Sequence, residues 1–152
     1  MNDLLPLRSV LADPSMACVG YIADSERADY QAAAEALDYA VAAIDFSSCT
    51  GKDDALARFA RALRFPDWFG DNWDGLQDCL SDLSWWPAEG YLLLLQDTEG
   101  WRQADPQGFG ITLEVLEQAS HAWRRQRIPF WAVLPVEDPF AARGVRRGPA
   151  RR

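Results

Sequence analysis

Short apolar runs alternate along the chain with segments in which apolar residues recur three and four positions apart. Runs of this length and composition predict buried strands, and they lie at 16–23, 39–46, 91–95 and 130–134. The amphipathic segments predict helices at about 26–37, 53–63, 71–83 and from 105 into the 120s. The run 91–95 is apolar on both faces, which favours a central strand. This alternation predicts an α/β fold with a small, largely parallel sheet packed with helices.

Residues that commonly begin or end helices support these boundaries. Asp24-Ser25 offers an N-cap to the first helix, and Asp71 or Asn72 offers one to the third. Phe65-Pro66 breaks the second helix, and Asp105-Pro106 opens the last. The composition of 136–152, dominated by Pro, Gly, Ala and Arg, predicts a disordered arginine-rich tail.

The third predicted helix and the residues before it carry five aspartates and no lysine or arginine between 65 and 82. At about 100° per residue these aspartates fall on one stripe, with the apolar side chains roughly opposite: Asp67, Asp71, Asp74, Asp78 and Asp82 against Trp73, Leu76, Leu80 and Leu83. Carboxylates four apart repel each other by a few tenths of a kcal/mol, about 0.2–0.5. The natural complement of such a stripe is a basic partner.

A simpler interpretation of the stripe is a solvated helix face, which fits Asp71 and Asp82 best. That interpretation leaves Trp68-Phe69 beside the acids unexplained, since aromatic side chains next to charges are typical of binding hot spots. Periodicity alone allows Trp68 to be either a core residue or a contact residue.

Composition and charge restrict the class of protein. The chain has 152 residues, enough for one domain with a core of its own, and a net charge of −8. Five of its 15 basic residues are arginines in the last ten positions. The rest of the chain is therefore more acidic than the net charge of the whole chain suggests. An acidic body repels nucleic acid and attracts basic proteins.

Cysteine usage and hydropathy suggest where the protein works. Three widely spaced cysteines without a CxxC pair suit reduced thiols. The N-terminus does not resemble a signal peptide, and the longest apolar run is too short to cross a bilayer. We expect a soluble, cytoplasmic protein without membrane contact.

Catalytic signatures are few. The chain has one histidine, His121, within a predicted helix, and no GxGxxG, P-loop or GxSxG motif. We therefore expect no enzymatic activity and no cofactor. One alternative stays open: Asp71, Asp74 and Asp78 could hold Mg²⁺ or Ca²⁺ in a metal-dependent hydrolase.

The segment 65–80, FPDWFGDNWDGLQDCL, resembles the signature of barstar-like ribonuclease inhibitors. That signature has proline, an aromatic pair, glycine, a polar residue, asparagine, two aspartates four apart, cysteine and leucine. The resemblance covers 39–135, and residues 1–38 would be an added strand and helix packed on the same domain.

The resemblance implies that the acidic helix and the loop before it plug the active site of a basic ribonuclease. By motif position, Asp78 takes the place of a substrate phosphate and Asp74 is the second anchoring acid. Trp68 would cover the active-site histidine. The other implied contacts are Phe69, Gly70, Asn72, Trp73 and Gln77, the last standing where the archetype has an aromatic residue.

These observations predict a monomeric inhibitor of the immunity or antitoxin type that binds a nuclease toxin one to one and does not bind nucleic acid directly. The alternatives are a barstar-like module that binds another basic protein, and the metal-dependent hydrolase.

Overall fold

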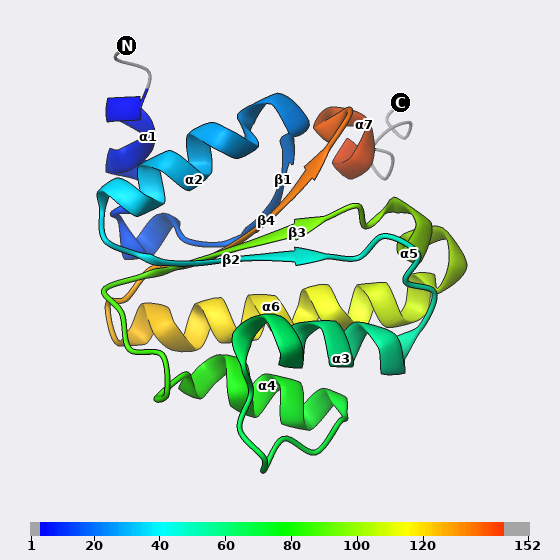
Figure 1. Cartoon of the computed structure of the whole chain (residues 1–152). Coiled ribbons are helices and arrows are strands. Elements are labelled where there is room, and N and C mark those ends of the chain that lie inside the picture. The colour runs from blue at the N-terminus through cyan, green and yellow to red at the C-terminus, as the bar shows by residue number, and fades with distance from the viewer. Residues whose placement is uncertain (1–3, 145–152) are drawn as a thin grey trace.

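Four strands form a single parallel sheet in the computed structural model, which describes residues 4–144 (Figure 1). The strands are β1 (Val19–Ala23), β2 (Ala40–Asp45), β3 (Tyr91–Gln96) and β4 (Phe130–Val136). Their order across the sheet is β1-β4-β3-β2, and every neighbouring pair is parallel. The predicted α/β fold with a central strand at 91–95 is confirmed, since β3 lies between β2 and β4.

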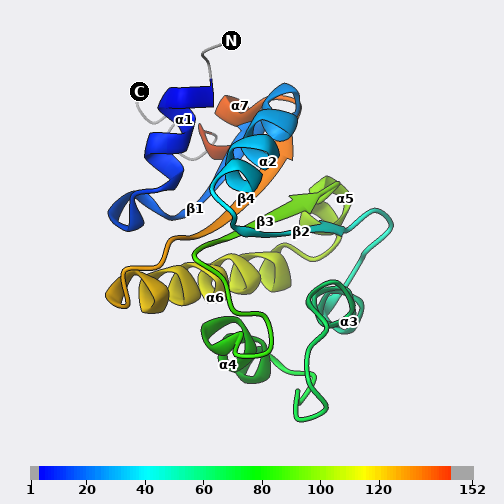
Figure 2. The same cartoon turned by 60° about the vertical axis from the view of Figure 1, so that its left-hand side comes forward.

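Helices cover both faces of the sheet. They are α1 (Leu4–Leu11), α2 (Arg27–Ala36), α3 (Lys52–Leu63), α4 (Trp73–Asp82), α5 (Glu99–Ala104), α6 (Pro106–Arg125) and α7 (Pro139–Gly144). Figures 1 and 2 show α1, α2 and α7 on one side of the sheet and α3, α4 and α6 on the other. The helix α4 lies outermost in its layer and packs against α6.

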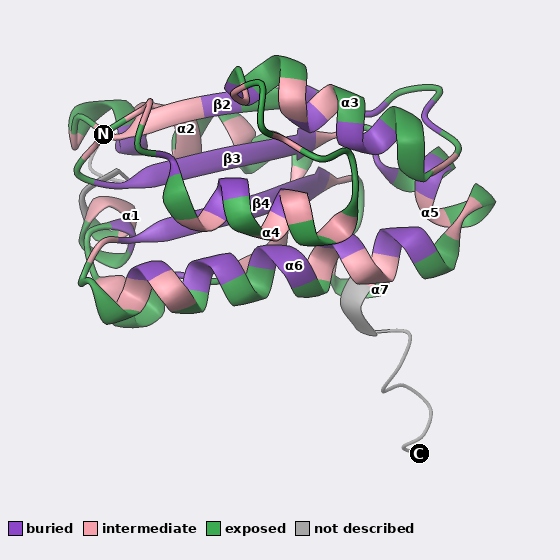
Figure 3. Cartoon of the chain, turned by 90° about the horizontal axis from the view of Figure 1, so that it is seen from below, coloured by how far each residue is buried: buried purple, intermediate pink, exposed green. Residues whose placement is uncertain are grey.

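The core has two parts because successive side chains of a strand point to opposite faces. Leu92 and Leu94 of β3 pack with the α1–α2 layer, and Leu93 and Leu95 pack with the α3–α4–α6 layer. All five residues from Tyr91 to Leu95 are buried. Figure 3 shows buried positions along β3 and β4 and along the inner faces of α4 and α6.

The N-terminal segment joins the same sheet. β1 pairs with β4 at the sheet edge, and two side chains tie the end of α1 to the strands. The hydroxyl of Tyr39 donates to the carbonyl oxygen of Leu11 at 3.0 Å, and the indole N–H of Trp131 donates to the same oxygen at 3.1 Å.

The predicted cap of the helix at 26–37, which corresponds to α2, is wrong in detail. Asp24–Glu26 forms a short 3-10 turn before α2, and the Glu26 carboxylate accepts the N–H of Ala23 at 2.9 Å. A carboxylate that folds back to the preceding strand thus takes the place of the expected Asp24-Ser25 cap.

The predicted disorder of 136–152 is wrong over its first part. β4 continues to Val136, and α7 begins at Pro139, where Asp138 accepts the N–H of Ala141 at 3.1 Å. Residues 145–152 of the predicted tail lie outside the described residues. Within residues 4–144, no helix combines the length and the apolar character that a membrane span requires.

Candidate partner-binding site

The helix α4 presents carboxylates on one side and core residues on the other. Leu76, Cys79 and Leu80 are fully buried beside α6. The side chains of Asp74, Asp78 and Asp82, which we call the acidic face, are exposed. The predicted amphipathic helix and the exposure of Asp74 and Asp78 are confirmed; their role in binding stays a prediction.

The stripe of five aspartates is wrong as a helical feature. Asn72 is the N-cap of α4, and its side-chain oxygen accepts the N–H of Gly75 at 2.6 Å. Asp67 and Asp71 therefore lie in the loop 64–72, outside the helix, and both are exposed. Asp71 has φ 55°, a left-handed conformation that aspartate tolerates better than most residues.

An aromatic cluster supports the loop 64–72. The ring of Phe65 lies 4.9 Å from that of Phe69 and 6.0 Å from that of Trp85, edge to face in both cases. The indole N–H of Trp85 donates to the carbonyl oxygen of Leu63 at 2.9 Å, which fixes Trp85 against the end of α3. The loop therefore rests on the side chain of Trp85, which comes from outside it.

Trp68 lies on the outer side of this cluster. Its ring meets that of Trp85 edge to face at 6.1 Å, yet 57% of Trp68 is exposed. Of the two interpretations that periodicity allowed, core residue or surface residue, the structure favours the surface. Large exposed hydrophobic side chains are few among the described residues, namely Val10, Met16, Trp68 and Phe140.

Gly75 is a residue that the sequence analysis did not assign to the site. A Cβ atom at this position would lie 3.1 Å from both the Asn72 side-chain oxygen and the Gly70 nitrogen, and 3.2 Å from the Phe69 ring. The loop folds back on the first turn of α4 at this point. A sequence signal existed, because glycine within a helix costs about 1 kcal/mol relative to alanine and so suggests a packing reason.

The other predicted contacts lie in the loop 64–72 and along α4. Trp73 is half-buried, and the Lys52 ammonium lies 5.9 Å from its ring centroid. Gln77 is also half-buried and lines a cavity of about 480 Å³ beside α6, together with Glu114 and Glu117. Gly70 and Asn72 are exposed and Phe69 is half-buried, so all of the predicted residues, which lie between positions 68 and 78, are exposed or half-buried.

Hydrogen bonding and burial hold α4 in place. The buried indole N–H of Trp123 in α6 donates to the carbonyl oxygen of Leu80 at 2.8 Å. Burial, and then the nearby carboxylates of Asp78 and Asp82, raise the pKa of the Cys79 thiol to about 11. Cys79 is thus a protonated residue of the core. The hydrogen bond from Trp123 and the buried side of α4 fix the backbone that carries the acidic face.

The metal alternative gains no geometric support. Among residues 4–144, no three side chains of His, Cys, Asp or Glu come close enough together to hold a metal ion. His121 is exposed on α6.

Comparison with known proteins agrees with this architecture. The sequence matches the family model Barstar (barnase inhibitor) over residues 39–135, and the chain therefore belongs to the barstar family. No curated protein matches the chain.

Similarity to solved structures concerns the fold alone. One match is a chain from a "Structure of Drosophila ORC bound to DNA", with a TM-score of 0.54 and 16% sequence identity. The match covers 90% of this chain and 37% of the other, so this chain spans little more than a third of that protein's length.

Proposed function

We propose that this protein inhibits a basic ribonuclease by inserting the acidic face of α4 and the loop 64–72 into the nuclease active site. It would act as an immunity protein in the cytoplasm of the cell that makes the nuclease. Membership of the barstar family, which is a family of inhibitors, supports a binding function over a catalytic one.

The observation that carries the proposal is the way α4 presents Asp74 and Asp78. Both carboxylates are exposed, one helical turn apart, on a helix whose opposite side is fully buried. A carboxylate accepts bidentate hydrogen bonds from arginine as a phosphate oxygen pair does. Because aspartate is short and its backbone is held, little conformational entropy is lost on binding.

The exposed Trp68 supplies the apolar part of the site. Aromatic anchors surrounded by polar contacts dominate the binding energy of many interfaces. Trp68 is buttressed by Trp85, so its ring is already held at the surface before a partner arrives.

The charge of the protein favours a basic partner over nucleic acid. The chain has 23 acidic residues against 15 basic ones, and it carries a net charge of −8. A field of this sign accelerates encounters with basic proteins and disfavours contact with phosphate backbones. One acidic face per chain fits a one-to-one complex.

The test compares Asp78→Ala with its matched control, Asp82→Ala, in a ribonuclease inhibition assay. The nucleases are barnase and the basic nucleases of the organism that makes this protein. We expect Asp78→Ala to weaken inhibition by about 2 kcal/mol or more, and Asp82→Ala, near the end of α4, to have a far smaller effect. Both residues are exposed, so the melting temperature should change little in either variant.

Two results would contradict the proposal. Asp78→Ala could inhibit as well as the parent, or the parent could bind a basic nuclease without slowing RNA cleavage. The second result would favour the alternative of an interaction module for a basic protein.

A further inference from the structure

The strand β2 is an edge of the sheet, and half of its backbone groups face outward. Neighbouring residues of a parallel strand alternate in the side to which their N–H and C=O groups point. The Ala40 N–H donates to Gly90 and the Phe46 N–H donates to Gln96, so the even-numbered residues face β3. Val41, Ala43 and Asp45 therefore direct their backbone groups away from the sheet.

One of these outward groups has a partner at the end of the strand. The Arg58 guanidinium donates to the carbonyl oxygens of Asp45 at 2.7 Å and Ser47 at 2.8 Å. The N–H and C=O groups of Val41 and Ala43 form the central part of the edge. Such an edge is a template for pairing with another strand.

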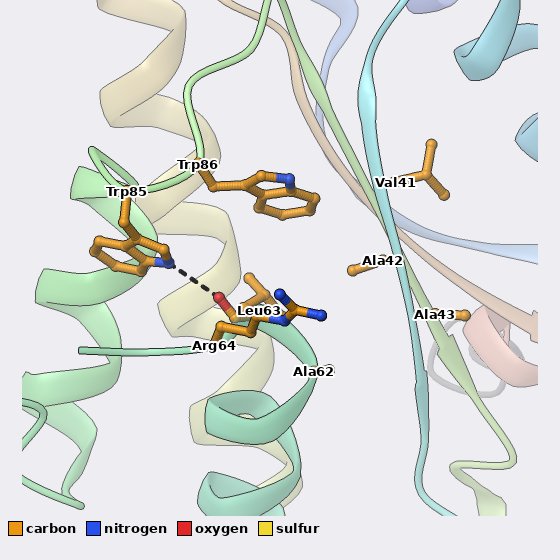
Figure 4. Close-up of a pocket in the computed structure, with 8 residues that line it drawn as sticks. All are labelled: Val41, Ala42, Ala43, Ala62, Leu63, Arg64, Trp85 and Trp86. Atoms are coloured by element: carbon orange, nitrogen blue, oxygen red, sulfur yellow. Dashed lines mark hydrogen bonds between the residues drawn. The ribbon is translucent and has the colours of Figure 1, made fainter. Parts of the chain in front are cut away.

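A groove runs along this edge. Its middle part is a cavity of about 470 Å³ between Val41–Ala43 of β2, the end of α3 at Ala62–Arg64, and the rings of Trp85 and Trp86 (Figure 4). Ala43 and Ala62 also line a neighbouring cavity of about 390 Å³, and Trp86 also lines one of about 620 Å³. The three cavities share lining residues, and we call them together the β2 groove.

One wall of the β2 groove is basic although the chain as a whole is acidic. Arg58, Arg61 and Arg64 follow one another at intervals of three along α3 and its C-terminal cap, and all three line the groove. Arg58 is paired with Asp54 at 3.0 Å. Arg61 and Arg64 are exposed, and their side chains have neither a hydrogen-bond nor an ion-pair partner within residues 4–144. Figure 4 shows the side chain of Arg64 extending from the end of α3 toward β2.

We propose that the β2 groove binds an extended, acidic segment of another polypeptide as an added β-strand. The outward N–H and C=O groups of Val41 and Ala43 would pair with its backbone, and Arg61 and Arg64 would bind its carboxylates. Asp38 and Glu89 line the end of the groove at the start of β2, where they would repel acidic side chains. The carboxylates of the ligand therefore belong further along the groove, beside Arg61 and Arg64.

The shape and chemistry of the groove favour a single strand over a second copy of this chain. The end of α3 and the ring of Trp86 wall one side of the edge, which suits one extended segment better than another folded domain. In a second copy the corresponding strand Ala40–Asp45 carries one carboxylate, and its own Ser47 already hydrogen-bonds that group. The proposal does not depend on nuclease inhibition, since the acidic face of α4 takes no part in it.

The test measures binding of a fluorescein-labelled octapeptide in which valine alternates with glutamate, by fluorescence anisotropy at low ionic strength. A peptide with lysine in place of glutamate is the charge control. We expect the glutamate peptide to bind and the lysine peptide not to bind. On saturation with the glutamate peptide, amide hydrogen exchange at Val41 and Ala43 should slow.

Two sets of variants separate charge from backbone pairing. The double variant Arg61→Ala/Arg64→Ala should weaken peptide binding about tenfold or more, whereas Arg125→Ala, an exposed arginine at the end of α6, should leave it unchanged. Ala43→Pro removes one outward N–H and should weaken binding similarly, whereas Ala43→Ser retains it and should not.

Three results would overturn the proposal: absence of binding by the glutamate peptide, equal binding by the lysine peptide, or unchanged affinity in the double arginine variant. A dimer in sedimentation that dissociates on addition of the glutamate peptide would overturn it as well, because a second copy would then occupy the edge. If Ala43→Pro fails to fold, the arginine variants and the hydrogen-exchange measurement still decide, because neither depends on that substitution.

Discussion

At the scale of single residues, Gly75 connects the geometry of α4 to that of the loop 64–72. An added methyl group would press on the Asn72 side chain, the Gly70 nitrogen and the Phe69 ring, all within 3.2 Å. The contacts that it would disturb are those that position the loop. A substitution at Gly75 should therefore change the shape of the site while leaving the stability of the fold nearly unchanged.

We expect Gly75→Ala to weaken nuclease inhibition about tenfold while the free energy of unfolding changes by no more than about 1 kcal/mol, since the better helix propensity of alanine offsets the crowding. The control is Gly100→Ala in α5, where an added Cβ meets no atom within 4 Å. Urea unfolding and inhibition assays measure both quantities. Full inhibition by Gly75→Ala would show that the loop geometry does not matter.

The thiol of Cys79 gives a prediction about pH. Its pKa rises from the ordinary value of 9.0 to about 11, chiefly through burial. The folded state therefore holds this proton more tightly than the unfolded state. The corresponding stability is complete below pH 9 and is lost as the pH approaches 11, by about 2–3 kcal/mol.

The measurement is urea unfolding of the parent and of Cys79→Ala between pH 8 and pH 11. Burial also raises the pKa values of Cys49, Tyr39 and Tyr91, so both proteins should lose stability in this range. The parent should lose more. Parallel curves would show that ionisation of Cys79 costs nothing in the folded protein.

At the scale of elements, the contact between α4 and α6 sets the position of the acidic face. Leu80 lies in the last turn of α4, where carbonyl groups lack partners within the helix, and the indole N–H of Trp123 binds its carbonyl oxygen. Trp123→Phe removes this donor. We expect a loss of stability of about 1–3 kcal/mol and faster amide exchange in the last turn of α4.

The matched control is Trp131→Phe, which removes a similar bond to Leu11 in the opposite layer. It should destabilise the protein without increasing amide exchange selectively in α4. Equal exchange in the last turn of α4 in the two variants would mean that Trp123 does not fix this helix.

The sequence predicted elements well where apolar periodicity was long. The strands and the helices α2, α3, α4 and α6 follow from their spacing, and Asn72 is one of the two caps that the sequence offered for α4. The helices α1, α5 and α7 have eight residues or fewer, too few to establish a period. The stripe of five aspartates failed because periodicity does not reveal the N-cap at Asn72 or the left-handed turn at Asp71.

At the scale of the whole molecule, long-range packing determines features that the sequence did not predict. The loop 64–72 rests on Trp85, and α4 is fixed by Trp123, 43 positions after its partner Leu80. The β2 groove combines residues from α3, β2 and the segment after α4. The local spacing of residues predicted the acidic helix, but these contacts join residues far apart in the sequence, so local spacing could not predict them.

The arrangement separates two surfaces of opposite charge. The acidic face of α4 is exposed, and the arginines of α3 line the β2 groove at the edge of the sheet. β1 joins the sheet at the opposite edge, next to β4. The added N-terminal elements therefore leave the segment 64–78, which carries the candidate site, uncovered.

The most direct test of the central claim is the initial rate of RNA cleavage by the target nuclease, measured against inhibitor concentration at several substrate concentrations. If α4 occupies the active site, inhibition is complete at one equivalent, and the apparent inhibition constant rises linearly with RNA concentration. Partial inhibition at saturation, or an inhibition constant independent of RNA concentration, would show that this protein does not block the active site.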